Sequence, residues 1–337
     1  MERQVWQVKK TGSLNRMELV QQIMSPLADN HVRIKVKAIG LNYADIFSVF
    51  GLYSATPKGR FTPGLEVSGI VVATGKAVSN YRIGQAVIAV TRFGGYSSLI
   101  DCTANYIWPL PDKWHWNEGA AWLVQTLTAW YGLCKLANVQ SAQTVLIHSA
   151  AGGVGLRAMQ LVKALGGKAY GVVGTATKKQ FLEKQGFSAL IRNKGAYAKQ
   201  LQSLPEKGVD VVLDAIGGKI QQAAYRFLNP QGKLVVFGAA NFTPVGQKLN
   251  WLRIVWQFLV RPRYDPLAMM SNNISIHAFN LIWLWDQQTL LNEGYKAVQQ
   301  LHLPKPFVGR SYSFSQAIEA LDYLRSGQSI GKVVLMV

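Results

Sequence analysis

Val145-Leu-Ile-His-Ser-Ala-Ala-Gly-Gly-Val-Gly155 is the stretch of sequence that decides the fold. An apolar strand enters a glycine-rich turn, and the turn opens a segment whose pattern predicts a helix to about Leu165. Ala150, Gly152 and Gly155 fit the pattern G-x-G-x-x-G, with alanine in the first place. A small first residue permits the tight turn, Gly152 lets the backbone approach a pyrophosphate, and Gly155 lets the helix pack closely on the strand. The stretch therefore predicts a dinucleotide-binding turn, and the alternative is a tight strand–helix turn without a ligand.

The segment after the next predicted strand, residues 169–174, indicates which dinucleotide would bind. A site that prefers NAD places Asp or Glu at this strand end, about twenty residues past the loop, to bind the ribose 2′-hydroxyl. Here the chain reads Gly174-Thr-Ala-Thr-Lys178-Lys179, with no acid before Glu183. Lys178 suits a 2′-phosphate, so the sequence predicts NADPH as the cofactor. The alternative for Lys178 is a solvated lysine in the first turn of a helix.

Composition sets the broad class of protein. The 337 residues are enough for two domains, and 49% of them are hydrophobic, so we expect a sizeable core. No run of eighteen uncharged apolar residues is present, and the N-terminus has no apolar stretch of signal-peptide type. Cys102 and Cys134 are too few for a disulfide framework. These features predict a cytoplasmic protein.

The formal net charge of +19 exceeds what one anionic cofactor needs. Such an excess can attract nucleic acid or an acidic membrane surface. The alternative is a solubilising surface, and no common RNA-binding motif is visible. Residues 248–263, which begin at Lys248, combine basic residues with large aromatics and contain no acid. They fit a membrane surface or a cover over a substrate cleft, but we expect a buried linking helix or a dimer contact there.

The order of predicted elements favours two domains. Short strands at residues 30–40, 64–72 and 85–90, separated by glycine turns, predict a β-rich N-terminal part. Residues 117–135 have a helical pattern. After the glycine loop, strands and helices alternate, which predicts a parallel, doubly wound sheet. The segments of that alternation are 169–173, 177–185, 189–192, 209–214, 220–228, 233–237 and 274–279, before a helix at 316–326 and a strand at 332–337.

Several short motifs resemble the medium-chain dehydrogenase/reductase superfamily, and the zinc-free quinone oxidoreductase branch (zeta-crystallin-like) in particular. They are Gly40-Leu-Asn42-Tyr-Ala-Asp45, Gly51-Leu-Tyr53, Pro63-Gly-Leu-Glu66-Val-Ser-Gly69, Gln125-Thr-Leu-Thr128, the glycine loop and Val212-Leu-Asp214-Ala-Ile-Gly-Gly218. Residues 276–281 and the ending Gly331-Lys-Val-Val-Leu335 are similar to the subgroup named for a synaptic vesicle membrane protein. The resemblance implies an α/β protein in which a β-rich, GroES-like catalytic domain (1–124 and 281–337) carries a doubly wound Rossmann domain (125–280) that binds NADPH.

Zinc is not expected. Zinc-dependent members of the superfamily have a cysteine near the residues here called Asn42–Asp45 and a histidine just before the residue here called Glu66. In this chain Leu65 precedes Glu66, and neither cysteine falls at a ligand position. Since catalytic zinc needs three protein ligands, we predict no metal.

The resemblance then implies an NADPH-dependent, zinc-independent oxidoreductase that transfers a hydride to a quinone-type acceptor. Reduction of an enone, 2-alkenal or enoyl group is an alternative that differs only in acceptor. An alternative from another class is a low-turnover, nucleotide-regulated protein that binds RNA or a membrane surface. Tyr53 is the candidate for the substrate pocket and for proton donation, although Phe47 stands where related quinone reductases often have a second tyrosine. Tyr53 can equally be an ordinary loop aromatic.

The resemblance also implies which residues surround the cofactor. Asn42, the second candidate for catalysis, matches a residue near the nicotinamide ribose, and Thr128 matches one near the nicotinamide or its phosphate. Arg192 can replace, with a full charge, a tyrosine that helps hold the 2′-phosphate. The alternatives are that Asn42 is a turn residue at a strand end, that Thr128 bonds the backbone of its own helix, and that Arg192 is a solvated arginine. The implied cofactor-binding set is Asn42, Thr128, Ala150, Gly152, Gly153, Val154, Gly155, Gly174, Thr175, Lys178, Arg192, Asn193, Phe237, Gly238, Phe279 and Lys332.

Three further residues and the oligomeric state complete the expectations. Asp214 and Glu66 read as structural acids, and His148 as a core or cofactor-shell histidine. Members of the superfamily commonly dimerise through the outer edge of the nucleotide sheet, here near residues 274–279. We therefore expect a homodimer that acts on a small-molecule quinone or enone.

Overall fold

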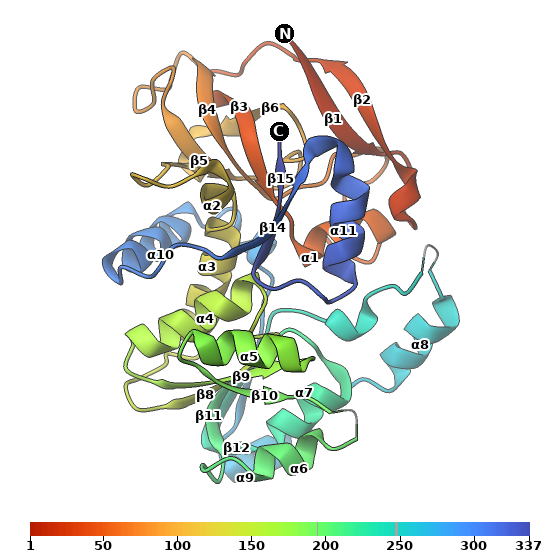
Figure 1. Ribbon diagram of the computed structural model, residues 1–337, viewed down its shortest axis with the longest axis vertical. Coiled ribbons are helices and arrows are strands. Elements are labelled where there is room, and N and C mark those ends of the chain that lie inside the picture. The colour runs from red at the N-terminus through yellow and green to blue at the C-terminus, as the bar shows by residue number, and fades with distance from the viewer. Residues whose placement is uncertain (194, 247–248) are drawn as a thin grey trace.

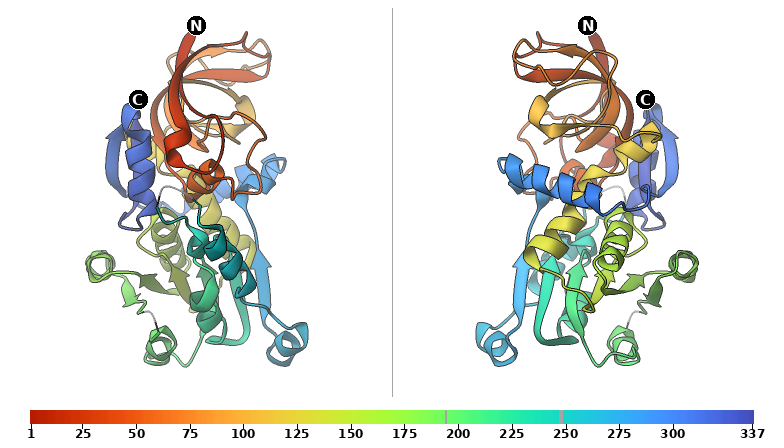
Figure 2. Two further views of the ribbon diagram at one scale, coloured as in Figure 1. Left: turned by 90° about the vertical axis from the view of Figure 1, so that its right-hand side faces the viewer. Right: turned by 90° about the vertical axis from the view of Figure 1, so that its left-hand side faces the viewer.

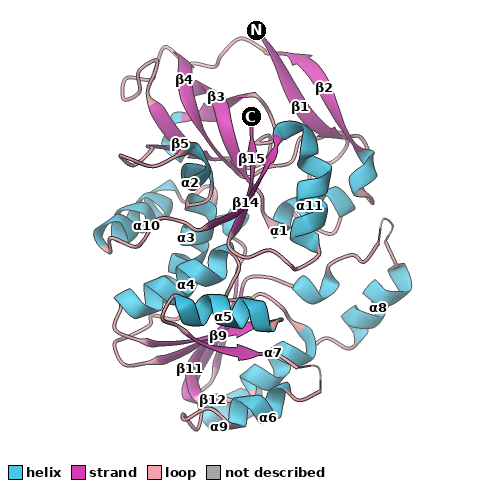
Figure 3. Ribbon diagram, in the orientation of Figure 1, coloured by secondary structure: helices cyan, strands magenta, loops and turns pink. Residues whose placement is uncertain are grey.

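Two large β-sheets occupy opposite halves of the molecule, one above and one below a middle layer of helices (Figure 1). This layer includes α3 (Leu123–Trp130) and α4 (Gly153–Ala164) and is called the waist below. The structure is a computed structural model that describes residues 1–193, 195–246 and 249–337. Both termini lie in the upper half, so the chain enters the lower half once and returns (Figure 2). Sheets and helices mix throughout, which confirms the predicted α/β class (Figure 3).

The lower half is a six-stranded parallel sheet with the order β10-β9-β8-β11-β12-β13. This is the doubly wound order in which the first strand lies in the middle and the chain then builds outward on each side. The registers are parallel throughout. The strands are β8 (Thr144–His148), β9 (Lys168–Val173), β10 (Ser188–Ile191), β11 (Val209–Asp214), β12 (Leu228–Val236) and β13 (Ser275–Ala278).

Alternating side chains of these strands pack on two separate cores, one on each face of the sheet. Ile147 and Val173 lie in the core that includes α4, whereas Leu146 and Val172 lie in the core that includes α6 and α7. This is why the strands read as continuous apolar runs rather than as alternating ones. The helices of this half are α4 (Gly153–Ala164), α5 (Ala176–Lys184), α6 (Tyr197–Gln202), α7 (Gly218–Tyr225), η4 (Ala240–Phe242), α8 (Trp251–Leu259) and α9 (Pro266–Asn272).

The upper half is a seven-stranded sheet with the order β14-β15-β3-β4-β5-β7, in which β6 also pairs with β3. The last strand of the chain, β15, pairs antiparallel with β3, and Val334 lies opposite Gly40. The predicted return of the C-terminus to the β-rich part is therefore confirmed. The strands are β3 (His31–Gly40), β4 (Glu66–Thr74), β5 (Ala86–Val90), β6 (Leu99–Thr103), β7 (Ile107–Pro109), β14 (Val308–Ser313) and β15 (Lys332–Met336), beside a ribbon of β1 (Glu2–Val8) and β2 (Met17–Ile23).

Helices of the upper half and the waist connect the two sheets. The helical pattern predicted for residues 117–135 is confirmed, and the structure divides it into α2, α3 and a π-helical turn, η3. The ribbon of β1 and β2, the strand β14 and the helix α10 were not predicted. The remaining helices are η1 (Leu14–Arg16), α1 (Tyr43–Phe50), η2 (Ala104–Tyr106), α2 (Trp116–Ala120), α3 (Leu123–Trp130), η3 (Tyr131–Leu136), η5 (Leu281–Leu284), α10 (Gln288–Gln300), η6 (Phe314–Gln316) and α11 (Ala317–Arg325).

We expected a buried linking helix or a dimer contact within residues 248–263. The buried helix is wrong for the part that the structure describes, whereas the dimer contact stays a prediction. The helix exists as α8, but none of its residues is buried. It stands at the outer edge of the molecule, beside the waist (Figure 1). Lys248, where the predicted segment begins, lies outside the described residues.

Candidate cofactor-binding and active site

The glycine-rich turn joins β8 to α4. Ser149 takes a left-handed conformation at φ 55°, which turns the chain out of the strand. A Cβ at Gly155 would lie 2.4 Å from the carbonyl oxygen of Ser149, so only glycine fits there. Gly152 caps α4 with an extended backbone and no capping side chain. The first N–H groups of α4 have no intrahelical acceptor and are free to bind an anion.

One cavity of ≈ 480 Å³ runs from this turn into the space between the two halves. Ala150, Thr175 and Asn193 do not line it. Ala150 is fully buried beneath the loop, Thr175 caps α5, and Asn193 is exposed. The other members of the predicted cofactor set, and Tyr53, all line the cavity: Asn42, Thr128, Gly152, Gly153, Val154, Gly155, Gly174, Lys178, Arg192, Phe237, Gly238, Phe279 and Lys332.

Positive side chains gather at the end of the cavity beside β9 and β10. Lys178, in the first turn of α5, donates to the carbonyl oxygen of Gly327 at 2.6 Å. Burial and then the charge of Arg192 lower the pKa of Lys178 to about 8. Burial also lowers the pKa of Arg192. Two cations that disfavour each other in this way favour an anion between them.

Arg325, at the end of α11, is a third cation of this wall that the sequence did not suggest. Its guanidinium donates to the carbonyl oxygens of Pro244 and Gly246 and contacts Asp322. No local motif marks it, because it reaches the cavity only when the C-terminal helix packs against the waist.

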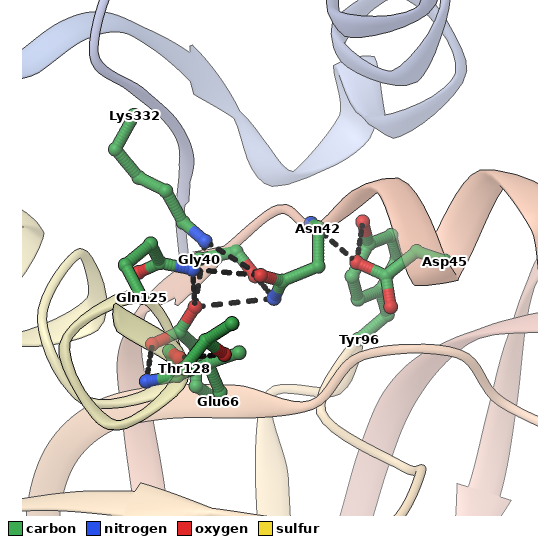
Figure 4. A network of polar contacts seen from close by, with 9 residues as sticks. Gly40, Asn42, Asp45, Glu66, Tyr96, Gln125, Thr128 and Lys332 are labelled. Carbon is green, nitrogen blue, oxygen red and sulfur yellow. Dashed lines mark hydrogen bonds and ion pairs between the residues drawn. The ribbon is translucent and has the colours of Figure 1, made fainter. Parts of the chain in front are cut away.

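A buried polar network lies beneath the middle of the cavity (Figure 4). Glu66 Oε1 accepts from Lys332 Nζ at 2.6 Å, from Gln125 Nε2 at 2.9 Å and from Asn42 Nδ2 at 3.1 Å. Its Oε2 accepts from the backbone N–H of Val124 at 3.1 Å. The prediction that Glu66 is a structural acid agrees with this environment, in which its charge is paired and its oxygens are satisfied. Gln125, which the sequence marks only as part of a motif, belongs to the same network and lines the cavity.

Every hydrogen-bonding position of the Asn42 side-chain amide is occupied by another group of the protein. Its Oδ1 accepts from Gln125 Nε2 at 2.7 Å and from Lys332 Nζ at 2.9 Å. Its Nδ2 donates to the carbonyl oxygen of Gly40 and to Glu66, both at 3.1 Å. Since an amide has two donors and one oxygen with two lone pairs, Asn42 has no bond left for a ligand. Its role in this state is to connect the network to the start of α1.

Asp45 and Thr128 border this network. Asp45 Oδ2 accepts from the backbone N–H of Asn42 at 2.8 Å and from the hydroxyl of Tyr96 at 3.1 Å. Burial raises the pKa of Asp45 to about 7. Thr128 donates to the carbonyl oxygen of Val124 at 2.6 Å, so its hydroxyl can face a ligand only as an acceptor.

The opposite end of the cavity is apolar and aromatic. Tyr53 donates to Asn280 Oδ1 at 2.8 Å, and burial raises the pKa of its phenol to about 12. Trp285 stacks on Tyr106 with 4.0 Å between ring centroids. Beside the polar side chains of Tyr53, Thr91 and Asn280, this end is lined by apolar side chains that include Phe47, Leu65, Val90, Leu281, Ile282 and Leu291.

His148 lies at the cavity wall and at the centre of a second buried cluster. Its Nδ1 is 2.5 Å from Asp214 Oδ1 and its Nε2 is 2.9 Å from the hydroxyl of Tyr197. Asp214 also accepts from two backbone N–H groups and from Gln221. The cluster joins strands β8 and β11 below the glycine loop. This position agrees with the predictions that His148 lies in the core or around the cofactor and that Asp214 stabilises the fold.

No group of three or more His, Cys, Asp or Glu residues suited to a metal ion occurs in the described part of the chain. Cys102 is buried in β6, and Cys134 lies in η3. No described helix is long and apolar enough to cross a membrane.

Comparison with known proteins identifies the family. A model described as "Alcohol dehydrogenase GroES-like domain" matches residues 28–112, and one described as "Zinc-binding dehydrogenase" matches residues 153–259. The chain is 30% identical, over 96% of its length and 68% of the other's, to the "Synaptic vesicle membrane protein VAT-1 homolog" of Danio rerio. A structure of Escherichia coli quinone oxidoreductase complexed with NADPH is 26% identical with a TM-score of 0.85, and each chain is covered completely. The CurK enoyl reductase, 24% identical with a TM-score of 0.84 over 99% of each chain, shares the fold.

The chain therefore belongs to the medium-chain dehydrogenase/reductase family, with a GroES-like half and a Rossmann-type half. Within that family it is a quinone oxidoreductase-like protein near the subgroup of the synaptic vesicle membrane protein VAT-1 homologues.

Proposed function

We propose that this protein is an NADPH-dependent, zinc-independent oxidoreductase that passes a hydride to a quinone-type acceptor. The observation that carries the proposal is one continuous cavity with two chemically different ends. Lys178 and Arg192 provide positive charge at one end, and the apolar, aromatic surface around Tyr53 lies at the other. A phosphorylated dinucleotide and a neutral, planar acceptor are the partners that match these ends. The NADPH complex of the Escherichia coli relative supports the choice of cofactor.

The residues present fit this cofactor. The N-terminus of α4 and the close approach permitted by Gly152 suit the pyrophosphate, and Lys178 with Arg192 suits the 2′-phosphate. NADPH would supply the hydride, so the protein has only to bind, orient and exclude water. Asn42 and Lys332 form a rigid polar floor between the two ends, held by Glu66.

Tyr53 is the group suited to deliver a proton to the reduced acceptor. Its phenol keeps its proton across the physiological range because burial raises its pKa to about 12. Asn280 accepts from the phenol and fixes its direction. An enone or enoyl substrate would need such a proton at carbon, whereas a hydroquinone can take its protons from water. Enone, 2-alkenal or enoyl reduction is therefore the second candidate, supported by Tyr53.

The test is an anaerobic panel with chelator-treated protein, using 1,4-benzoquinone and trans-2-hexenal as acceptors and NADPH or NADH as donor. We expect turnover of the quinone with NADPH, at least about tenfold better than with NADH, since a charged hydrogen bond to the 2′-phosphate contributes about 1.5–3 kcal/mol. Faster turnover of the alkenal would select the second candidate. Loss of activity on chelation would contradict zinc independence, and equal use of both donors would contradict the cofactor assignment.

We further propose a homodimer and the domain division at residues 124/125 and 280/281. The outer edge of β13 ends the parallel sheet and can pair with a second copy across a two-fold axis. Sedimentation velocity tests the dimer, and an Ala278→Pro substitution, which removes a backbone donor from the free edge of β13, should weaken it. A monomer at micromolar concentration would contradict this assembly.

A further inference from the structure

The apolar end of the cavity, called the acceptor end here, has an arginine stacked on a tryptophan at its outer margin. Thr91, directly after β5, and Ile282, in η5, both line the cavity. The residue that follows each of them, Arg92 and Trp283 respectively, does not line it and is exposed. The guanidinium carbon of Arg92 lies 5.5 Å from the centroid of the Trp283 ring. A cation–π contact thus joins two walls of the acceptor end just outside the cavity.

The stacked guanidinium keeps its hydrogen-bond donors free. Apart from the contact with Trp283, Arg92 has no hydrogen-bond acceptor and no carboxylate partner in the described part of the chain. A guanidinium has five N–H donors in one plane, and stacking on an indole uses only the face of that plane. The edge stays available. The group that matches this edge is a carboxylate, which accepts two parallel hydrogen bonds from it.

A second loop, residues 53–63, lies against the turn that carries Arg92 and holds it in place. Phe61 of this loop packs edge-on against Phe93 with 5.7 Å between ring centroids. Backbone hydrogen bonds of 2.8 and 2.9 Å also join the two segments. Within the turn, the hydroxyl oxygen of Thr91 accepts from the backbone N–H of Phe93 at 3.2 Å. The backbone on both sides of Arg92 is therefore fixed by packing and hydrogen bonds.

The surface around this margin is positively charged. Lys58 and Arg60 are exposed in the same second loop. Glu66, which is buried in the polar network, is the only acid from residue 46 to residue 100. Asp286, the acid nearest to η5 along the chain, is exposed and makes no ion pair within the described residues. An acceptor with a negative charge at its outer end would therefore be attracted to this margin, whereas a neutral one would gain nothing from it.

We propose that the acceptor carries a carboxylate on an alkyl tail, and that Arg92 binds this carboxylate outside the cavity. The inference rests on the proposed function, because it names the substrate class of the same reaction. The neutral, planar group that receives the hydride lies inside the cavity, and the tail leaves it beside Trp283. Arg92 contacts neither the reacting atoms nor the cofactor, so it determines specificity rather than catalysis. The substrate class is a quinone or an enal with a carboxylated alkyl chain.

The test compares acceptors that differ only at the end of the tail, with NADPH as donor. The quinones are 3-(1,4-benzoquinon-2-yl)propanoate and 6-(1,4-benzoquinon-2-yl)hexanoate, and the enal is 8-oxooct-6-enoate. Each is paired with its methyl ester. For at least one tail we expect kcat/KM to be about fivefold higher for the acid than for the ester, the upper range for an ion pair open to solvent. The difference should lie in KM, with kcat within about twofold, and high salt should reduce it.

Substitutions at two exposed arginines assign the effect to a residue. Arg92→Gln should remove the advantage of the acid and leave the kinetics of the ester unchanged. Arg92→Lys should keep only part of the advantage, because an ammonium has the charge without the two-pronged edge. The matched control is Arg82→Gln, which alters an exposed arginine in the turn before β5, at the opposite end of that strand, and should keep the full advantage. Thermal melts check that all three variants fold.

The outcomes separate this inference from the proposed function. If the esters are reduced but no acid has an advantage over its ester, the inference is wrong and the proposed function stands. The same holds if an advantage exists and Arg92→Gln retains it, because another group then recognises the acid. If neither the acids nor the esters are reduced, both the inference and the proposed function are overturned.

Discussion

Lys332 Nζ lies 2.6 Å from Glu66 Oε1, and both side chains are buried. The pair joins the last strand of the chain, β15, to β4, two strands that are separated in the sheet by β3. Burial lowers the pKa of Lys332, and the neighbouring carboxylate of Glu66 opposes that shift. The ion pair therefore fixes the C-terminus and, through Asn42, the start of α1 under the cavity.

Removing one partner of this pair should destabilise the protein strongly. Lys332→Met leaves the Glu66 carboxylate buried without a cation, and we expect a loss of about 3–5 kcal/mol in the free energy of unfolding. Adding Glu66→Gln should recover part of that loss, because no uncompensated charge remains. Urea unfolding measures both. Lys9→Met, which breaks the exposed pair between Lys9 and Glu18, serves as the control and should change stability by less than about 1 kcal/mol.

Lys178→Ala should reduce the preference for NADPH. The ammonium is suited to the 2′-phosphate, and losing a charged hydrogen bond corresponds to about 1.5–3 kcal/mol, or at least about tenfold in kcat/KM. The value for NADH should stay nearly constant. Steady-state kinetics with both donors make the measurement, and Lys179→Ala, at the next position in α5, is the control. A proportional loss with both donors would indicate a structural role instead.

The preference for NADPH should also fall with rising pH. Because the pKa of Lys178 is lowered to about 8, its ammonium loses its proton as the pH rises through that value. We expect the ratio of kcat/KM for NADPH over NADH to decrease between pH 7 and pH 9. In Arg192→Ala the neighbouring charge is absent, so the decrease should move to higher pH. A ratio that does not vary with pH in the native chain would contradict the assignment of Lys178.

Gly152→Ala and Gly155→Ala should have different effects. A Cβ at Gly155 would lie 2.4 Å from the backbone of Ser149, so the variant must shift the loop and should lose about 1–3 kcal/mol of stability. A Cβ at Gly152 would meet only the same carbonyl, at 3.3 Å, so that variant should remain folded. Its methyl group would instead lie where a pyrophosphate approaches. Thermal melts and NADPH titration by fluorescence separate the two effects.

Tyr53→Phe should separate the two kinds of acceptor. The variant keeps the ring but loses the hydroxyl that donates to Asn280. If the phenol protonates carbon, kcat for an enal should fall about a hundredfold, the lower range for general acid catalysis. Reduction of a quinone should change only a few-fold. Equal, small changes with both acceptors would show that Tyr53 lines the pocket but does not donate the proton.

Local sequence predicted most of the nucleotide-binding half. The strand before Ser149, the glycine turn and the alternating elements up to β13 follow from patterns that act over a few residues. Lys178 was found because it lies at a fixed distance from the loop, in the first turn of α5. The ribbon of β1 and β2 and the strand β14 were missed, because their apolar residues do not alternate regularly with polar ones.

Tertiary structure decided the features that depend on distant parts of the chain. Lys332 meets Glu66 only because β15 returns to β3, and Arg325 reaches the cavity only because α11 packs at the waist. Three of the four partners of the Asn42 amide, Glu66, Gln125 and Lys332, come from distant segments, which no spacing in the sequence reveals. Likewise, the apolar pattern of α8 predicted a helix but not its direction. Periodicity gives the two sides of a helix, whereas the hydrogen bonds from Arg253 to the carbonyl oxygens of Thr243 and Asn241 determine which side faces outward.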